Sequence, residues 1–412
     1  MIEKYDVVVI GGGAAGLIAG GYSAMNNKTA VIERNERVAR KVMITGKGRC
    51  NVTNLCDRDT FIKSVTQNGR FLYSAYSEFS PYDIIDLLES MGVETKVERG
   101  NRVFPVSDKA VDVVDALHKF CVKNGAEIIN GRAIDFEIAD GRISSVILED
   151  GRIIKCNAAI IATGGMSYTK TGSTGDGYSL AEKFGHTITK IRPSLVPLEI
   201  HEGFCADMMG LSLKNIAINV MDTVKNKSVY NDFGEMIFTH FGVSGPVILS
   251  ASAHMREMSA ERYKIFIDLK PALDEKTLDE RIQRDFAENI NREFINSLDK
   301  LLPKKMIPVV VRLSKIPPKT KVNQIKKADR LRLVSLIKHL ELTVTDFRPI
   351  EEAIVTSGGV SVKEIEPKTM RSKLCDNLYF AGEVIDVDAY TGGFNLQIAF
   401  STGCIAGKNV LQ

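Results

Sequence analysis

DVVVIGGGAAG at residues 6–16, followed by KTAVIE at residues 28–33, is the stretch of sequence that decides the fold. The apolar run before the glycines predicts a buried parallel strand, and the glycine turn predicts a helix whose N-terminus points at a pyrophosphate. Gly11 permits the tight turn, Gly13 lets the backbone approach phosphate oxygens, and Gly16 lets the helix pack on the strand. These residues together predict a dinucleotide-binding domain.

The acid at the end of the second strand is Glu33. A carboxylate at this place accepts hydrogen bonds from ribose hydroxyls, whereas an arginine would have indicated a 2′-phosphate. The strand, the glycine turn, the helix and the acid follow one another in the expected order. This fingerprint does not by itself decide between FAD and NAD.

The overall composition is that of an ordinary globular protein. A chain of 412 residues favours two or three domains. A net charge of only +3 gives no global reason for binding nucleic acid or a membrane surface. No apolar run approaches the roughly 20 residues that cross a bilayer.

Cysteine usage and the N-terminus both bear on the cellular compartment. The seven cysteines show neither CxxC nor Cys/His ligand spacing, so we expect reduced thiols and no metal site. The first strand begins within a few residues of the N-terminus, which leaves no room for a signal peptide. The sequence therefore predicts a cytoplasmic protein.

The rest of the first 193 residues continues the α/β pattern. Apolar periodicity predicts helices over residues 81–91 and 111–125, with a strand or hairpin between them over residues 95–105. Short alternating stretches over residues 126–161 predict a β-meander that leads back into the central sheet.

The character of the chain changes after Pro193. Alternating segments predict an antiparallel barrel or sandwich, and they lie at residues 195–200, 213–223, 228–239 and 263–269. Helical periodicity follows over residues 274–340, and the strand-and-glycine pattern resumes near residue 343. We therefore expect a cofactor domain interrupted by one long insertion. The predicted segments are 1–193 (cofactor domain, first part), 194–272 (barrel), 273–342 (helical subdomain) and 343–412 (cofactor domain, C-terminal part).

Two later segments favour FAD over NAD. AAIIATGG at residues 158–165 predicts a strand that returns beside the phosphate loop, where the glycines permit a close turn. LYFAGEV at residues 378–384 predicts a buried strand that ends at Gly382 and Glu383. Because a nicotinamide-only domain needs neither segment, we expect FAD. No second GxGxxG follows a strand, so we expect no dedicated NAD(P)H domain.

RKVMITGKGRCNVTN at residues 40–54 is rich in basic residues and glycines, so it can lie along the FAD pyrophosphate. Cys50 and Cys56 are separated by five residues, which is wrong for a redox pair on one helix. We expect Cys50 to pack against the cofactor as a neutral thiol.

Two further glycine-rich segments lie later in the chain. Thr391-Gly392-Gly393 precedes an apolar helical stretch, whose N-terminus we expect to face the pyrimidine edge of the flavin. GSTGDG at residues 172–177 follows no apolar strand and is predicted to be a flexible loop.

Several motifs in combination resemble the BaiN-type flavoprotein family: GKGRCNVTN, RVFPVSDKA, GSTGDGY, FTHFGVSGP, VTSGGV and YFAGEVIDVDAYTGGFNLQIAFSTG. The resemblance implies a glutathione-reductase-type, Rossmann-like FAD domain of the α/β class, interrupted by a β-barrel and a small helical subdomain. It implies either 3-dehydro-bile-acid delta-4,6-reductase activity or aminoacetone oxidase activity. Carried over by motif, the FAD contacts fall on Ala14, Ala15, Glu33, Arg40, Lys41, Arg49, Cys50, Ala133, Thr163, Gly164, Glu383, Asn395 and Leu396.

The first hypothesis for the chemistry is reduction of a conjugated carbonyl compound. NAD(P)H would reduce the flavin, which passes hydride to a flat 3-oxo-steroid, and a side chain would supply a proton. Tyr168 and Tyr390 are the candidate proton donors, while Arg102 and His240 could polarise a carbonyl. The alternative hypothesis is a flavin amine oxidase that acts on a small amine such as aminoacetone and uses oxygen.

Residues 304–332 carry ten lysines and arginines against one acid, Asp329. Such a patch can contact phosphates, but it lacks interleaved aromatic residues and any nucleic-acid motif, which favours a solvated face. The patch could also steer an anionic substrate such as a bile acid or its coenzyme A ester. We therefore expect a small-molecule substrate, no nucleic acid and no membrane insertion, and leave the oligomeric state open.

Overall fold

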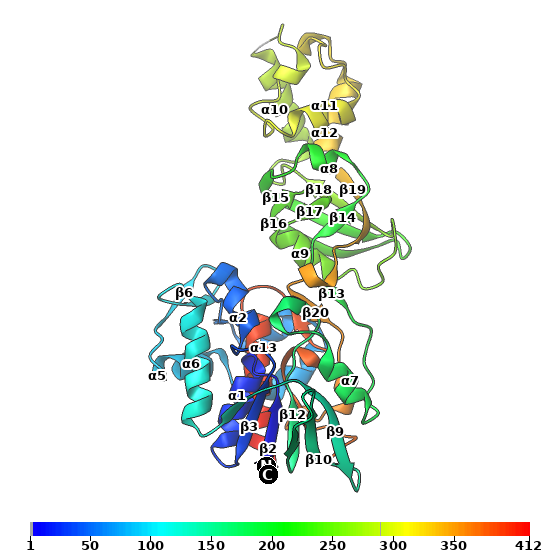
Figure 1. The fold of residues 1–412 in the computed structure, drawn as a ribbon. Coiled ribbons are helices and arrows are strands. Elements are labelled where there is room, and N and C mark those ends of the chain that lie inside the picture. Colours follow the sequence, from blue (N-terminus) through cyan, green and yellow to red (C-terminus); the bar gives the residue numbers. More distant parts are fainter. Residues whose placement is uncertain (1–2, 289) are drawn as a thin grey trace. The chain divides into compact units, whose positions relative to one another are not determined.

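The protein is described by a computed structural model that covers residues 3–288 and 290–412. The chain forms two compact units (Figure 1). The first unit combines residues 1–194 with residues 350–412, and the second unit comprises residues 195–349. Each unit is described separately below.

A parallel five-stranded sheet forms the centre of the first unit, with the strand order β21-β12-β2-β3-β8. Its strands are β2 (Val7–Ile10), β3 (Thr29–Glu33), β8 (Glu127–Asn130), β12 (Ala158–Ile161) and β21 (Leu378–Phe380). Strands β2, β3, β12 and β21 are buried throughout, which explains why their sequences are nearly continuous apolar runs. The predicted α/β fold class is confirmed.

The helices of the first unit are α1 (Ala14–Ala24), α2 (Arg40–Ile44), α3 (Arg58–Ser64), α4 (Tyr73–Glu78), α5 (Pro81–Ser90), α6 (Ala110–Lys123), α7 (Asp176–Glu182) and α13 (Phe394–Asn409). Helices α1 and α13 pack closely against each other. A Cβ atom at Gly403 would lie 2.5 Å from the carbonyl oxygen of Ala15, and one at Gly407 would lie 2.4 Å from that of Ala19. Glycine is therefore required on this face of α13.

Smaller sheets complete the first unit. The strands are β1 (Glu3–Lys4), β9 (Ala133–Ala139), β10 (Arg142–Leu148) and β11 (Ile153–Lys155) in one sheet, β4 (Thr53–Asn54), β6 (Thr95–Glu98) and β7 (Arg102–Pro105) in a second, β5 (Val65–Gln67) with β22 (Asp388–Ala389), and β13 (Arg192–Ser194) with β20 (Val355–Ser357). The predicted helices α5 and α6, the hairpin β6–β7 and the antiparallel meander β9–β10–β11 are all present.

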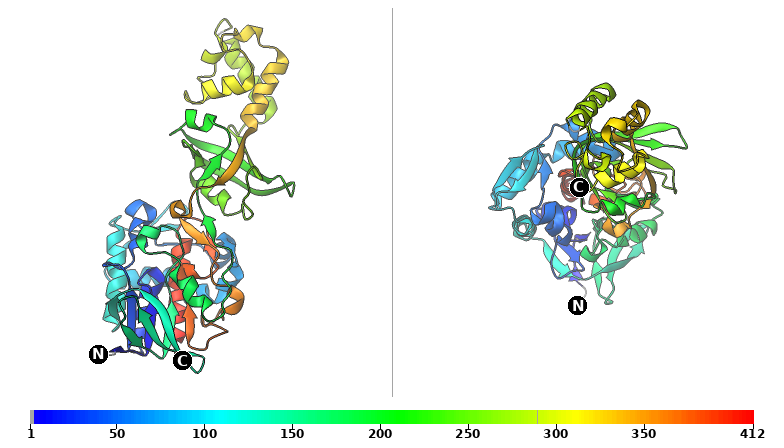
Figure 2. Two further views of the ribbon diagram at one scale, coloured as in Figure 1. Left: turned by 45° about the vertical axis from the view of Figure 1, so that its right-hand side comes forward. Right: turned by 90° about the horizontal axis from the view of Figure 1, so that it is seen from above.

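A closed antiparallel barrel dominates the second unit, with the order β14-β17-β16-β15-β18-β19. Its strands are β14 (Leu198–Ile200), β15 (Ser212–Asp222), β16 (Lys227–Phe238), β17 (Gly242–Ser244), β18 (Tyr263–Asp268) and β19 (Leu340–Phe347). Its helices are α8 (Phe204–Asp207), α9 (Pro246–Ser252), α10 (Glu275–Ala287), α11 (Ile307–Ser314) and α12 (Lys327–Lys338). Figure 2 shows the barrel mainly in green and α10–α12 in yellow tones.

The structure corrects two expectations for the second unit. The boundary expected at residue 343 falls inside β19, whose buried Leu342 and Val344 pair with β18 in the barrel. The helical pattern predicted over residues 274–340 is interrupted, because α10 ends at Ala287 and α11 begins at Ile307; residue 289 lies outside the described residues. The chain instead turns to bury Phe294, whose N–H donates to the carbonyl of Thr320 at 2.9 Å.

Candidate functional site

A cavity of about 800 Å³ opens at the carboxyl ends of the central strands in the first unit. It is lined by the residues that end or follow β2, β3 and β12, together with parts of α1, α2 and α13. The first strand, β2, lies between β3 and β12, so the strand order reverses at this point of the sheet. Ligands of open α/β sheets bind at such switch points, and the volume suits a large cofactor.

The three glycines of the first turn have different roles. Gly11 has φ of 104°, and a Cβ atom there would lie 2.6 Å from the carbonyl oxygen of Ala162. A Cβ atom at Gly13 would meet nothing within 4 Å, so this backbone faces open space. Gly16 does not line the cavity. It packs against the backbone of Gly11, and a Cβ atom at Gly16 would lie 1.8 Å from the carbonyl oxygen of Gly11. Gly16 therefore serves helix packing, and Gly13 serves ligand access.

The donor groups beside this turn fit a pyrophosphate. Helix α1 begins at Gly13 without a side-chain cap, so its first N–H groups have no partner within the helix. The hydroxyl oxygen of Thr163, which lies beside Gly11 at the end of the neighbouring strand β12, is buried without a hydrogen-bond partner among the described residues. Free N–H donors at a helix N-terminus bind phosphate oxygens readily.

Glu33 is 7% exposed and lies at one end of the cavity. Its Oε2 atom accepts a hydrogen bond from the N–H of Gly12 at 3.0 Å, and its Oε1 atom accepts from the N–H and the side-chain amide of Asn35 at 2.8 and 2.7 Å. Oε1 therefore already accepts two hydrogen bonds, whereas Oε2 accepts one and keeps a further lone pair for a ribose hydroxyl. We call this region, with the residues bonded to it, the adenosine end.

The GSTGDG segment covers the adenosine end and is fixed in place, which corrects the expectation of a flexible loop. Arg34 donates to Thr174 at 2.7 Å and to Asp176 at 3.1 Å, and Arg132 donates to both oxygens of Asp176 at 2.8 and 3.0 Å. Burial alone would raise the pKa of Asp176, but the hydrogen bonds from Arg132 and Thr174 hold it below its ordinary value. No sequence pattern signals this network, because its partners come from three distant segments.

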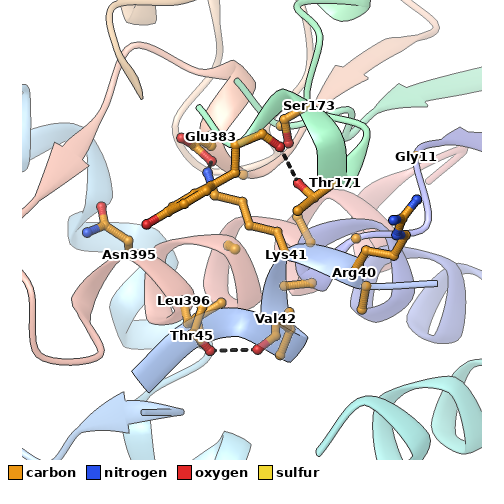
Figure 3. A pocket seen from close by; sticks show the side chains of 18 of the residues that line it. Gly11, Arg40, Lys41, Val42, Thr45, Thr171, Ser173, Glu383, Asn395 and Leu396 are labelled. Carbon is orange, nitrogen blue, oxygen red and sulfur yellow. Dashed lines mark hydrogen bonds and ion pairs between the residues drawn. The ribbon is translucent and has the colours of Figure 1, made fainter. Parts of the chain in front are cut away.

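Lys41 and Glu383 were expected to contact FAD separately, and the structure pairs them with each other. Lys41 Nζ donates to Glu383 Oε2 at 2.7 Å and to the hydroxyl of Ser167 at 2.7 Å. Glu383 Oε1 accepts from the N–H of Thr356 at 2.8 Å and from the Ser167 hydroxyl at 3.1 Å. Both side chains line the middle of the cavity, between Arg40 and Asn395 in Figure 3.

The N-terminus of α13 forms part of the wall beyond Glu383. The helix begins after Gly393, which has φ of 98°, and it has no side-chain cap. A Cβ at Gly393 would lie 2.3 Å from the backbone of Thr53, so β4 packs directly on this turn. The side-chain amide of Asn395 is held by the backbone of Ala389. Its oxygen accepts from the N–H of Ala389 at 2.9 Å, and its nitrogen donates to the carbonyl of Ala389 at 2.7 Å. That this helix N-terminus faces the pyrimidine edge of the flavin stays a prediction.

Most of the predicted cofactor residues meet at this one cavity. The lining includes Gly11, Gly13, Ala14, Ala15, Glu33, Arg40, Lys41, Arg49, Ala133, Thr163, Gly164, Gly382, Glu383, Asn395 and Leu396, together with the catalytic candidates Tyr168, Tyr390 and Arg102. Tyr168 adopts a left-handed backbone conformation with φ of 52°, which is unusual for a bulky residue. The individual contacts with FAD stay predictions.

Cys50 and His240 do not line the cavity. Cys50 is fully buried, and burial raises the pKa of its thiol to about 12, as expected for a neutral packing group. Neither Cys50 nor Cys56 forms a disulfide. His240 is exposed and lies between β16 and β17 of the second unit, whereas every lining residue belongs to the first unit. The catalytic role of His240 stays a prediction.

The sheet order, the glycine turn and the acid at Glu33 define a dinucleotide-binding oxidoreductase fold. The family model described as the HI0933-like protein Rossmann domain matches residues 5–409, so the chain belongs to this family. The protein is an FAD-dependent oxidoreductase.

Curated relatives carry two different names. The chain is 29% identical to the 3-dehydro-bile acid delta(4,6)-reductase of Clostridium scindens, over 97% of both proteins. It is 32% identical to the ribosomal RNA dihydrouridine synthase of Haemophilus influenzae, over 98% of this chain and 97% of the relative. The enzyme of that name from Escherichia coli is 29% identical, over 100% of this chain and 99% of the relative.

Among solved structures, the 3-ketosteroid delta1-dehydrogenase of Sterolibacterium denitrificans aligns with a TM-score of 0.53 and 12% identity, over 98% of this chain and 99% of that one. The 3-ketosteroid-delta4-(5alpha)-dehydrogenase of Rhodococcus jostii aligns with a TM-score of 0.51 and 13% identity, over 99% and 96%. At these identities the likeness concerns the fold alone. In the described part of the chain, no helix has the length and apolar character needed to span a bilayer, and no group of side chains is arranged to hold a metal ion.

Proposed function

We propose that the protein reduces a carbon–carbon double bond conjugated with a carbonyl, and that its substrate is a uracil base in ribosomal RNA. The two names carried by the relatives share this chemistry. An unsaturated 3-oxo-steroid and the C5=C6 bond of uracil both place the double bond next to a carbonyl. In uracil, the C6 atom takes the hydride and the C5 atom takes the proton.

When bound, FAD supplies the hydride, and NADPH or NADH is the proposed source of its electrons. The chain supplies the binding site and the proton. The uncapped start of α1 and the hydroxyl of Thr163 would hold the pyrophosphate, and Glu33 would hold the ribose. The hydroxyl of Tyr390 or Tyr168, both in the cavity wall, is the proposed donor to the carbon next to the carbonyl.

The observation that carries the RNA assignment is the charge of the helical segment in the second unit. Six exposed lysines there form neither an ion pair nor a side-chain hydrogen bond with any described residue: Lys304, Lys315, Lys319, Lys321, Lys326 and Lys327. We call them the lysine surface. The neighbouring Arg312 and Arg330 are instead paired with Asp207 at 2.8 Å and with Asp279 at 2.6 Å.

A group of lysines that form no ion pair with a described residue suits a phosphate backbone. Sequence analysis favoured a solvated face without a nucleic-acid partner, an expectation that the structure does not test. The names of the two ribosomal RNA dihydrouridine synthases support the RNA interpretation for this chain. A cytoplasmic location accords with this substrate and with seven cysteines that are all free thiols.

A 3-oxo-steroid of the bile-acid type, reduced at the delta-4 and delta-6 positions, is the second candidate substrate. It is supported by the 29% identity with the Clostridium scindens enzyme. The lysine surface would then steer an anionic substrate. The amine-oxidase alternative gains no support from the relatives.

The test is to incubate the purified holoenzyme with NADPH or NADH and unmodified ribosomal RNA transcribed in vitro. We expect mass spectrometry of the digested nucleosides to show uridine that has gained two hydrogens at a defined site. A parallel reaction contains a 3-oxo-4,6-diene steroid instead of RNA. Turnover of the steroid with no dihydrouridine in RNA would overturn the RNA assignment in favour of the second candidate.

The lysine surface is tested with the double variant Lys326→Gln and Lys327→Gln. We expect RNA affinity to fall several-fold and the salt dependence of binding to become shallower, because each lost phosphate contact lowers the logarithmic slope by roughly 0.7–0.9. Lys300→Gln is the matched control, since Lys300 belongs to the same helical segment but is paired with Glu288 at 2.5 Å. An equal effect in the control variant would contradict a dedicated surface.

A further inference from the structure

The end of the cavity opposite Glu33 is built by a small sheet and two loops of the first unit. Strand β4 pairs with β7, and the amide of Asn54 donates to the carbonyl of Gly392 at 3.1 Å and to that of Gly100 at 3.0 Å. The residues that line the cavity here include Thr45, Gly46, Lys47, Arg49, Asn51, Arg102, Phe104 and Tyr390. Because the sheet and the loops are tied together, this wall is a built surface. We call it the opposite end.

Asn51 is an uncharged polar side chain of this wall that lacks a partner among the described residues. Its Oδ1 atom is buried without a hydrogen-bond partner, and no described residue bonds its Nδ2 atom. A Cβ at Gly46, with φ of 57°, would lie 3.0 Å from the backbone nitrogen of Asn51, so the loop packs tightly around it. Buried amides of folded proteins are nearly always bonded. An amide left unbonded in a cavity wall therefore fits a ligand that offers one donor and one acceptor.

Two cations accompany the amide. Arg102 is exposed, donates from Nε to the carbonyl of Arg99 at 3.0 Å, and forms no ion pair with a described residue. Lys47 is exposed and likewise forms no ion pair with a described residue. Arg49 differs from both, because its guanidinium is bonded to Glu98 and to Asp108. The guanidinium carbons of Arg49 and Arg102 both lie over the Phe104 ring, at 4.3 and 5.8 Å from its centre.

No acid balances these cations in the cavity wall. The acidic side chains that line the cavity are Glu33, Asp176 and Glu383. Glu33 belongs to the adenosine end, Asp176 is bonded to Arg132, and Glu383 is paired with Lys41. The opposite end thus presents one amide and two uncompensated positive charges.

We propose that Asn51 recognises the target uracil through its N3–H group and an adjacent carbonyl, while Arg102 and Lys47 bind the phosphates that flank this nucleotide. The proposal rests on the proposed function. The uracil edge places one donor beside one acceptor, which is the complement of a side-chain amide. Sequence-specific RNA readers recognise unstacked bases on this edge, and enzymes that modify a base take it out of the stack.

The experiment compares Asn51→Ala with the wild-type holoenzyme on ribosomal RNA transcripts. We expect kcat/KM for dihydrouridine formation to fall about tenfold or more, the order of a two-bond base contact. The FAD content, the flavin absorption spectrum and the rate of flavin reduction by NAD(P)H should stay at wild-type values. Loss of FAD from Asn51→Ala would mean that the amide serves the cofactor, which would overturn the proposal.

A modified substrate gives a second readout. Replacing the target uridine with 3-methyluridine removes the N3–H group, so the wild-type enzyme should lose activity on it by a similar factor. Asn51→Ala should lose little further activity on the modified RNA. Additive losses would show that Asn51 and N3–H act separately, which would contradict the proposal.

Arg102→Gln tests the phosphate contact, and Arg99→Gln is the matched control because Arg99 is an exposed neighbour that does not line the cavity. We expect Arg102→Gln to raise KM for RNA and to reduce its salt dependence, and Arg99→Gln to change neither. If the wild-type enzyme reduces no uracil in RNA, the proposed function fails. If the wild-type enzyme is active and Asn51→Ala and Arg102→Gln match it, this inference alone fails.

Discussion

The two ends of the cavity differ in how far the protein satisfies its own polar groups. At the adenosine end, Glu33, Asn35, Arg34, Arg132 and Asp176 are bonded to one another or to the backbone. At the opposite end, the amide of Asn51 has no partner among the described residues, and neither Arg102 nor Lys47 forms an ion pair there. A pre-bonded wall holds one constant ligand in a fixed geometry, whereas unbonded groups are available to a substrate that comes and goes.

The largest expected effect distinguishes a glycine that folding requires from a glycine that FAD binding requires. In Gly16→Ala, the new methyl group would collide with the carbonyl of Gly11, so we expect a loss of about 3 kcal/mol or more and little folded protein. In Gly13→Ala, the methyl group meets open space, so the stability of the apoprotein should be nearly unchanged while FAD binding weakens. Thermal melts with and without added FAD measure both effects. Equal melting temperatures for the two apoproteins would contradict these separate roles.

A smaller effect should follow from removing the ion pairs that hold the loop over the adenosine end. Asp176→Asn removes the charge that bonds both Arg34 and Arg132, with a side chain that is 19% exposed. Hydrogen bonds to charged groups contribute about 1.5–3 kcal/mol, and partial exposure places this case near the lower limit. We therefore expect FAD to bind about tenfold more weakly, with kcat unchanged at saturating FAD. Fluorescence titration of the apoprotein with FAD is the measurement, and a lowered kcat at saturation would place Asp176 in the chemistry instead.

The smallest effect concerns Asp388, a buried acid two residues before Tyr390. Its Oδ2 atom accepts hydrogen bonds from Thr66 and Ser194, both at 2.8 Å, while Oδ1 has no partner among the described residues. Burial raises the pKa of Asp388 above its ordinary value. The folded state therefore favours the protonated acid.

The raised pKa of Asp388 determines the direction in which the stability of the protein changes with pH. The contribution of Asp388 is fully present below the ordinary Asp pKa of about 3.9, and it is lost as the pH rises through the raised pKa of the folded protein. Asp388→Asn should reduce this loss of stability with rising pH. Chemical denaturation from pH 5 to pH 8 is the measurement. The Asp176→Asn variant is the control, and its stability should change with pH above pH 5 as that of the wild type does. Parallel slopes for wild type and Asp388→Asn would contradict the assignment.

The sequence predicts features that depend on residues close together in the chain, and it misses features that depend on residues far apart. Gly11, Gly13 and Glu33 belong to a short local unit in which each residue type has one steric or bonding role, so the fold at the cavity was predictable. The bonds from Arg34 and Arg132 to Asp176 join segments that are far apart in the sequence, and a glycine-rich loop carries no mark of such partners.

The barrel shows the same limit. Strand β17 has three residues, Gly242–Ser244, which is too short for an alternating pattern to be recognised. Strand β19 follows a long helical stretch, so its alternation from Leu340 was assigned to the helical subdomain and the C-terminal part of the chain. No sequence pattern marks Asn51, because an unbonded amide can be recognised only when its surroundings are known.

The central claim is that the FAD cavity serves reduction of a uracil base in ribosomal RNA. The most direct measurement is anaerobic reoxidation of the reduced holoenzyme, followed by flavin absorbance, with RNA transcript or 3-oxo-4,6-diene steroid as the acceptor. We expect rapid reoxidation by RNA with one dihydrouridine formed per flavin, and slow reoxidation by the steroid. Reoxidation by the steroid but not by RNA would contradict it.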